Sequence, residues 1–153
     1  MAGFTDELSE RPVFVTGADG FVGSHLIDTL VDYDADVHAF VRASSSGELQ
    51  NIQHQQDSVQ IHRGDLRDPH SVRVALTELA DRTEILIFHL GAQAHVGESW
   101  DRPYETVDAN VMGTLHLLQA AVDLDLDITK FDTAGTSEEY GNVKHEMREK
   151  HDI

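Results

Sequence analysis

The chain contains no cysteine, which excludes disulfide cross-links and thiolate metal sites. No stretch approaches the roughly 18 consecutive apolar residues that a membrane-spanning helix needs. The first residues, MAGFTDELSERP, are polar and acidic, without the basic-then-apolar order of a signal peptide. These absences predict a cytoplasmic protein, and 153 residues suffice for one domain with its own core.

Positive charge is also in short supply. Only three residues are lysine, and the formal net charge is −17 at pH 7. Such a surface repels phosphate backbones and anionic lipids, so neither nucleic acid nor a membrane is predicted as a partner. The acids are scattered among apolar segments, which argues against a disordered acidic chain. This composition is typical of halophile proteins, and an ordinary acidic domain is the alternative. We hypothesise that the fold requires salt to screen its self-repulsion.

Apolar runs and helical periods alternate along the chain. Strands are predicted at residues 12–17, 35–42, 58–64, 84–92 and 128–135. Helices are predicted where apolar residues recur at helical spacing, as at Val22, Leu26 and Leu30, at Val72, Leu76 and Leu79, and over about 108–122. Asp68 and Pro69 are expected to cap and open the second helix. Strands that are apolar throughout indicate a parallel sheet covered on both faces, so the predicted fold class is a doubly wound α/β sheet.

A glycine-rich turn joins the first predicted strand to the first helix. There Gly17 would permit a tight turn, Gly20 would let backbone N–H groups approach a pyrophosphate, and Gly23 would let helix and strand pack closely. The helix N-terminus adds the positive end of a dipole. A turn that binds nothing is the alternative. We predict a dinucleotide-binding turn made of Gly17, Asp19, Gly20, Phe21, Val22 and Gly23.

The spacing of this turn is G-x-x-G-x-x-G. Together with VTGADGFVGSHL, GDLRD, HLGAQAHVGES, NVMGTLHLL and TSEEYG, it resembles the extended short-chain dehydrogenase/reductases, and among them the NAD-dependent epimerase/dehydratase family. The resemblance covers residues 11 to about 144 and implies a nucleotide-sugar substrate. The stretches VHAFVRASSS, LGAQAHV and TSEEYGNV are most similar to the family's GDP-mannose 4,6-dehydratases. The implied domain at 1–153 is Rossmann-like but lacks the last strands and the C-terminal sugar-nucleotide domain.

The end of the second strand bears on the choice of cofactor. An NAD enzyme would carry an acid there to hold the ribose 2′-hydroxyl. Here Arg42 precedes three serines, and its planar fork of donors suits a 2′-phosphate, although a solvated arginine is the alternative. We therefore predict NADP, with NAD as the second choice.

The resemblance implies further cofactor contacts after two other strands. Asp65 and Leu66 match the family position that contacts the adenine, although an aspartate also commonly caps a turn. Leu90, Gly91, Ala92 and Gln93 close the fourth strand, where small residues let the backbone run along the cofactor. Because ligands lie across the carboxyl ends of parallel strands, these segments are expected to meet at one edge of the sheet.

Ten histidines raise the question of a metal site. No helical H-x-x-x-H pair or His/acid constellation occurs, so no metal is predicted and surface positions are expected for the histidines. His95 differs, because it follows LGAQA and the resemblance places this loop near the sugar nucleotide. Asn110 is expected to head the long helix and to order the sheet through its amide. Trp100 and Tyr104 are expected either to pack over a ligand or to anchor a loop.

Hydroxyls and carboxylates gather in DTAGTSEEYGN, behind the last predicted strand. The resemblance places Thr136 where the family hydrogen-bonds the sugar 4-hydroxyl, and Glu138 where dehydratases keep an acid. Oxidation at C4 acidifies the C5 proton, the carboxylate removes that proton, and water leaves from C6. Residues 136–139 also fit a helix capping box, with Thr136 as the N-cap and Glu139 returning the bond, which is compatible with this chemistry because it leaves Glu138 free.

Short-chain enzymes also use a Tyr-x-x-x-Lys pair, in which the lysine lowers the pKa of the tyrosine. Tyr140 and Lys144 fit the bare pattern, but Gly141 is unfavourable inside a helix and Ser137 is too close to Tyr140. The pair is therefore expected beyond Ile153. We predict the cofactor-binding part of a longer dehydratase, inactive alone, with a 4-epimerase, a 4-reductase or a non-catalytic binding module as alternatives.

The resemblance also implies an assembly. Extended family members dimerise through the long helix, here about 108–122, and the helix that carries the Tyr-Lys pair. The full-length protein is therefore expected to be a homodimer. Since the second helix is missing, this chain is expected to be a monomer or to associate weakly.

Overall fold

The computed structural model describes residues 7–43, 48–136 and 140–141. Its core is a five-stranded sheet in which every neighbouring pair is parallel, in the order β3-β2-β1-β4-β5. The strands are β1 (Pro12–Thr16), β2 (Asp36–Arg42), β3 (Gln60–Gly64), β4 (Ile85–His89) and β5 (Ile128–Thr133). The order reverses between β1 and β4, which is the point where ligands bind in doubly wound sheets.

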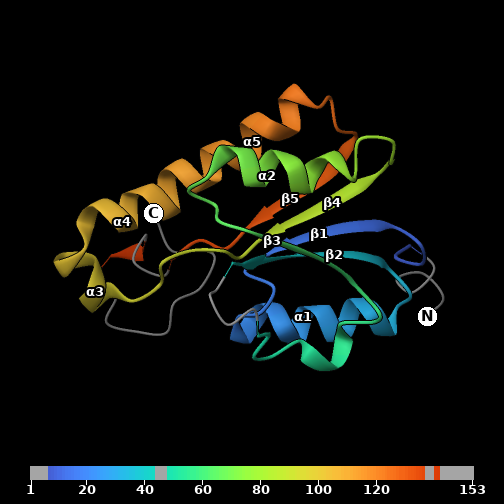
Figure 1. The fold of residues 1–153 in the computed structure, drawn as a ribbon, viewed down its shortest axis with the longest axis horizontal. Helices are drawn as coiled ribbons and strands as arrows, with labels where there is room; N and C mark the ends of the chain where they lie inside the picture. The colour runs from blue at the N-terminus through green and yellow to red at the C-terminus, as the bar shows by residue number, and fades with distance from the viewer. Residues whose placement is uncertain (1–6, 44–47, 137–139, 142–153) are drawn as a thin grey trace.

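Helices cover both faces of the sheet. In Figure 1, α1 (Phe21–Asp32) lies on one face, and α2 (Pro69–Thr77) and α5 (Gly113–Asp123) lie on the other. Alternate side chains of β1 point to opposite faces, so Val13 and Val15 pack in the core beside α1, while Phe14 packs in the core beside α2 and α5. The predicted doubly wound α/β class is confirmed.

The start of α2 has the cap and the proline that the sequence predicted. The carboxylate of Asp68 accepts hydrogen bonds from the backbone N–H groups of His70 (3.0 Å) and Ser71 (3.3 Å), and Pro69 occupies the first turn. These bonds satisfy amides that lack intrahelical partners. The predicted cap is confirmed.

Several strand ends differ from the prediction by a few residues. β4 was expected to reach residue 92 but ends at His89. The N–H of Leu90 still bonds to the backbone oxygen of Thr16 (3.3 Å), whereas the next N–H, that of Gly91, bonds to the Thr16 side chain (3.0 Å). The backbone ladder therefore stops. At β3, the N–H of Ser58 closes a turn onto Gln55, so this strand begins later than predicted.

The long helix predicted over about 108–122 is part of a larger helical segment. It follows α3 (Val96–Asp101) and α4 (Pro103–Val107), and a π-helical turn, η2 (Asp108–Met112), precedes α5; a short 3₁₀ turn, η1 (Gln53–Gln55), lies elsewhere. Asn110 thus lies inside the π turn and does not head the helix, which corrects the prediction. The prediction missed α4 because its apolar pattern began only at Val111.

The expectation that the histidines lie on the surface is wrong for His38 and His89, which are 1% and 5% exposed, and His62 is half-buried. His38 and His62 contact each other, with Nδ1 and Nε2 3.0 Å apart. Nitrogen atoms of these rings are within hydrogen-bond distance of side chains at least 24 residues away in the sequence. Among the residues described, no helix combines the length and apolarity needed to cross a membrane.

Candidate functional site

The three glycines of the turn meet different surroundings. Gly17 has φ +67°, and a Cβ there would lie 2.9 Å from the backbone nitrogen of Gly91. A Cβ at Gly23 would lie 2.2 Å from the carbonyl oxygen of Gly17. At Gly20 the nearest described atom, the same oxygen, would be 3.1 Å away and the rest of the space is open. The fold thus requires Gly17 and Gly23, whereas Gly20 leaves room for a ligand beside the backbone.

The N-terminus of α1 is prepared for an anion. Gly20 occupies the N-cap position, no described side chain caps it, and the first turn carries no acid. The first intrahelical bond runs from the N–H of Ser24 to the oxygen of Gly20, so the amides of Phe21 and Val22 precede it. Both residues are exposed. Amides that precede the first intrahelical bond and the positive end of the helix dipole together favour a phosphate group.

Asp19 has a structural role that sequence reasoning missed. Its carboxylate accepts hydrogen bonds from the backbone N–H groups of Gln50 (3.0 Å), Asn51 (2.7 Å) and Ile52 (3.2 Å). The side chain of Asn51 also donates to the Asp19 backbone oxygen (2.7 Å). These bonds fix the segment after β2, where Ile52 is fully buried. Contact with a cofactor stays a prediction for Asp19.

Asp65 caps a turn, as the alternative interpretation proposed. It accepts a hydrogen bond from the backbone N–H of Arg67 (3.0 Å), and the Arg67 guanidinium binds both of its oxygens. Bonding to Arg67 lowers the pKa of Asp65, and nearby Arg42 contributes further. Arg42 itself is exposed at the end of β2, opposite Gly64. The adenine contact of Asp65 and the phosphate contact of Arg42 stay predictions.

Leu66 packs against Gly91, which follows β4, and against Gly113, which begins α5. A Cβ at Gly91 would lie 2.7 Å from its Cδ1, and one at Gly113 would lie 2.9 Å from its Cβ. The ring of His116 donates to the Leu66 backbone oxygen through Nδ1 (2.8 Å). The ends of β1, β3 and β4 therefore meet at one edge of the sheet, as predicted.

The segment Leu90–Gln93 is fixed by an amide clamp. Oδ1 of Asn110 accepts from the backbone N–H of Gln93 (2.7 Å), and Nδ2 of Asn110 donates to the Gln93 backbone oxygen (3.1 Å). The amide of Asn110 thus orders the segment after β4 and not the sheet itself, which corrects the prediction. His95 follows, exposed, with its backbone N–H bonded to the Gln93 side chain (2.8 Å). Ala92 is exposed within the same segment.

His89 forms a second set of contacts at this edge that the sequence did not predict. Its Nδ1 lies 2.7 Å from Oγ1 of Thr16, and its Nε2 lies 2.9 Å from Oγ1 of Thr114. Burial lowers the pKa of His89. The only sequence signal is a polar residue that ends the most apolar strand, ILIFH, beside a threonine that ends β1.

The predicted catalytic cluster is only partly described. Thr136 is exposed three residues after β5, and β5 lies next to β4. Gly141 has φ +65°, which is incompatible with a right-handed helix running on from Tyr140, in agreement with the doubt about that tyrosine. Glu138 and Lys144 lie outside the described residues, as does most of the proposed capping box.

Trp100 and Tyr104 are 82% and 90% exposed, on α3 and α4. Such exposure argues against the predicted loop anchor, and packing over a ligand stays a prediction. Within the described ranges, no group of three or more His, Cys, Asp or Glu side chains is placed to hold a metal ion.

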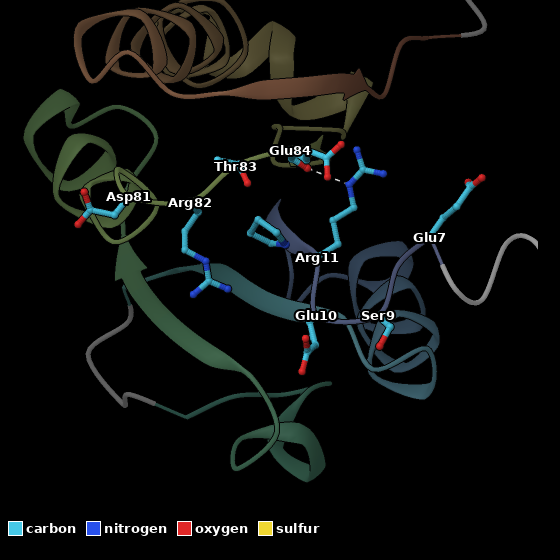
Figure 2. Close-up of a pocket in the computed structure, with 9 residues that line it drawn as sticks. Glu7, Ser9, Glu10, Arg11, Asp81, Arg82, Thr83 and Glu84 are labelled. Carbon is cyan, nitrogen blue, oxygen red and sulfur yellow. Dashed lines mark hydrogen bonds between the residues drawn. The ribbon is translucent and has the colours of Figure 1, made fainter.

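A cavity of about 490 Å³ lies at the amino ends of β1 and β4, away from the carboxyl edge that carries the glycine turn. It is lined by Glu7, Ser9, Glu10, Arg11, Pro12, Asp81, Arg82, Thr83 and Glu84. Figure 2 shows Arg11 bonded to the backbone oxygen of Glu84 (2.8 Å), where the chain enters β1 and β4. The acid-rich lining and the distance from the glycine turn do not suit a dinucleotide phosphate, so the candidate site is the carboxyl edge.

Comparison with known proteins identifies the family. A family model described as GDP-mannose 4,6 dehydratase matches residues 14–153. The chain belongs to the GDP-mannose 4,6 dehydratase family. It is 37% identical over 143 residues to a GDP-mannose 4,6-dehydratase of Vibrio cholerae, covering 88% of this chain and 38% of that protein. The family and the dehydratase branch predicted from the sequence are confirmed.

Solved structures of proteins with other names share the fold. The UDP-N-acetylglucosamine 4-epimerase from Methanobrevibacter ruminantium M1 superposes with a TM-score of 0.76 at 29% identity, covering 95% of this chain and 44% of that one. The UDP-glucose 4-epimerase of Thermus thermophilus, solved in complex with NAD, gives 0.64 at 31% identity, covering 76% and 35%. The chain thus spans less than half the length of each of these three proteins.

Proposed function

We propose that this chain is the NADP(H)-binding part of a nucleotide-sugar 4,6-dehydratase of the GDP-mannose type. The observation that carries the proposal is the turn at Gly17–Gly23, which meets the end of β4 at the sheet's switch point and precedes a helix, α1, that no side chain of the described residues caps. Membership of the GDP-mannose 4,6 dehydratase family supports the reaction class.

Each part of a dinucleotide can be assigned to residues at this edge of the sheet. The first amides of α1 and the open side of Gly20 suit the pyrophosphate, and Leu66 provides an apolar wall toward the adenine. Arg42 suits a 2′-phosphate. The Leu90–Gln93 segment borders the remaining half. When bound, the dinucleotide supplies the hydride acceptor.

The chemistry on the sugar is assigned to the segment after β5. Thr136 would hold the 4-hydroxyl by a hydrogen bond, and Glu138 would take the C5 proton once C4 is oxidised, so that water leaves from C6. The proposal places the Tyr-Lys pair and the sugar-nucleotide pocket in the remainder of a longer protein. This chain is therefore proposed to bind the cofactor without turnover.

Titration of NADP and NAD against the chain tests the cofactor. NADP is expected to bind more tightly, and Arg42→Ala is expected to weaken NADP roughly 10- to 100-fold, the range for a hydrogen bond to a charged group, with little effect on NAD. Arg73→Ala is the matched control, because Arg73 lies on α2 and pairs with Asp123. NAD binding as tightly as NADP would contradict the assignment.

A 4-epimerase or 4-reductase is the second candidate, favoured by the likeness to UDP-sugar 4-epimerase structures. The acid at Glu138 separates the two, because epimerisation does not need a base at C5. In the full-length protein, Glu138→Gln is expected to oxidise C4 yet not to eliminate water. Full dehydratase turnover by that variant would show that Glu138 is not the base, and a parent that oxidises C4 without eliminating water would favour the epimerase or reductase. A chain whose gene ends at residue 153 would favour a binding module.

A further inference from the structure

The imidazole of His89 joins three elements at the carboxyl edge. It ends β4, it contacts Thr16 at the end of β1, and it contacts Thr114 in the first turn of α5. It is buried, and it is not among the residues assigned to the cofactor above.

The hydrogen bonds of its neighbours determine where its proton lies. Thr114 donates its hydroxyl proton to the backbone oxygen of Asn110 (2.7 Å), so its oxygen must accept the Nε2–H of His89. Oγ1 of Thr16 already accepts the N–H of Gly91 (3.0 Å), and its own proton is free to reach Nδ1 of His89. Both contacts are satisfied by one form, the neutral imidazole protonated at Nε2.

The same bonds hold both ends of the segment after β4. At its start, the hydroxyl of Thr16 anchors the Gly91 amide. At its end, Thr114 anchors the backbone of Asn110, whose amide clamps Gln93 with bonds of 2.7 and 3.1 Å. The ring therefore lies between two sets of hydrogen bonds, one that reaches Gly91 through Thr16 and one that reaches Gln93 through Thr114 and the residue Asn110.

We propose that His89 is a positioning residue for dinucleotide binding, and that it holds the segment after β4 against the glycine turn only as the neutral Nε2–H imidazole. The proposal rests on the proposed function, since it takes Leu90–Gln93 to border the dinucleotide. Contact with the turn is direct, because a Cβ at Gly17 would lie 2.9 Å from the Gly91 nitrogen.

Protonation would break this arrangement. An imidazolium donates from both nitrogens, so the buried hydroxyl of Thr16 would lose its acceptor. The charge would be enclosed by Thr16, Thr114 and the ring of Phe131, whose centroid is 6.2 Å away, and none of these carries a charge. Burial is the sole cause of the lowered pKa of His89, without a counter-charge among the described groups. Cofactor affinity is therefore expected to fall on acidification.

The matched variants are Thr114→Val, which removes the acceptor for Nε2–H at nearly constant shape, and Thr114→Ser, which retains it. At about pH 7.5, NADP titration of Thr114→Val is expected to show a roughly 3- to 10-fold weaker affinity, the size of one hydrogen bond, and Thr114→Ser is expected to restore the parent value. Nitrogen NMR of the parent is expected to show His89 neutral, protonated at Nε2. The NADP affinity of the parent is expected to fall on acidification for two reasons, protonation of His89 and protonation of NADP itself. His89→Asn is expected to show only the second.

Three outcomes would overturn the proposal: an Nδ1–H or charged His89 at about pH 7.5, parent-like NADP affinity in Thr114→Val, or identical pH profiles in parent and His89→Asn. If the folded parent binds neither NADP nor NAD, the proposed function fails. The positioning role is then decided by hydrogen exchange. Faster exchange of the Gly91 and Gln93 amides in Thr114→Val, reversed in Thr114→Ser, supports it, and unchanged exchange overturns it.

Discussion

Among single residues, Gly20 and Gly23 differ in what a side chain would meet. A Cβ at Gly23 would lie 2.2 Å from the backbone oxygen of Gly17, whereas one at Gly20 would lie 3.1 Å from it. Gly23→Ala is therefore expected to lower the free energy of unfolding by about 1–3 kcal/mol through overpacking. Gly20→Val is expected to keep the fold and to lose NADP binding, because its side chain would occupy the pyrophosphate position.

Thermal melts followed by circular dichroism, with NADP titration of each folded variant, separate these effects. Gly20→Ala is the graded control, with a smaller loss of affinity. Parent-like NADP affinity in Gly20→Val would show that the turn does not hold a pyrophosphate.

Local rules predicted some of these residues and not others. The positive φ of Gly17, the contact of Gly23 with Gly17 and the Asp68 cap are local features, and these three residues have the structural roles expected of them. The bonds of Asp19 reach 31 to 33 residues along the chain, and those between Thr16 and His89 reach 73. Such partners become visible only once the strand order brings them together.

At the scale of elements, the buried histidines on β2 and β4 and the half-buried histidine on β3 make the stability of the sheet depend on pH. Burial is the largest cause of the lowered pKa of His38, His62 and His89 relative to 6.5. The unfolded chain therefore binds more protons than the folded one below about pH 6.5. The free energy of unfolding is expected to fall as pH drops through that value, by up to about 1.4 kcal/mol per pH unit for each histidine.

Urea denaturation at a series of pH values measures this slope. Relief of acidic self-repulsion acts in the opposite direction, so the informative quantity is the difference between the parent and His38→Gln. A shallower acid dependence in the variant is expected. Equal slopes in the parent and in His38→Gln would show that protonation of His38, on β2, does not affect stability.

The sequence predicted every strand and the covered faces because apolar runs report burial directly. It did not predict α4, because the apolar pattern that marked the long helix began only at Val111, and it did not predict that residues Asp108–Met112 within the long helix form a π turn. The ends of β4 and β3 were also misplaced, since side-chain and turn bonds decide where the ladder stops.

At the scale of the whole molecule, one side of the helical segment is apolar and exposed. It carries Val96, Trp100, Tyr104, Val107, Val111, Leu115, Leu118 and Val122, at successive spacings of three or four residues along α3 to α5. We propose that the full-length protein uses this face in a homodimer. The 153-residue chain alone is expected to sediment as a monomer or weakly associating species. A tight, salt-independent dimer would contradict this prediction.

Net charge sets a second prediction at this scale. With a formal charge of −17 on 153 residues, self-repulsion opposes the compact state. The melting temperature is expected to rise between low and molar KCl as salt shortens the Debye length to about 3 Å. Thermal melts over a KCl series measure this, with sucrose at matched viscosity as a control. A flat or falling curve would refute the requirement for salt.

The central claim is that a dinucleotide binds at the carboxyl edge of the sheet, at the β1/β4 switch point. Amide NMR shifts of the folded chain in molar KCl, recorded as NADP is added, test this claim most directly. The account predicts that the largest changes fall on residues 17–23 and 90–93. No shift changes, or changes confined to the cavity around Arg11 and Glu84 at the opposite edge, would contradict it.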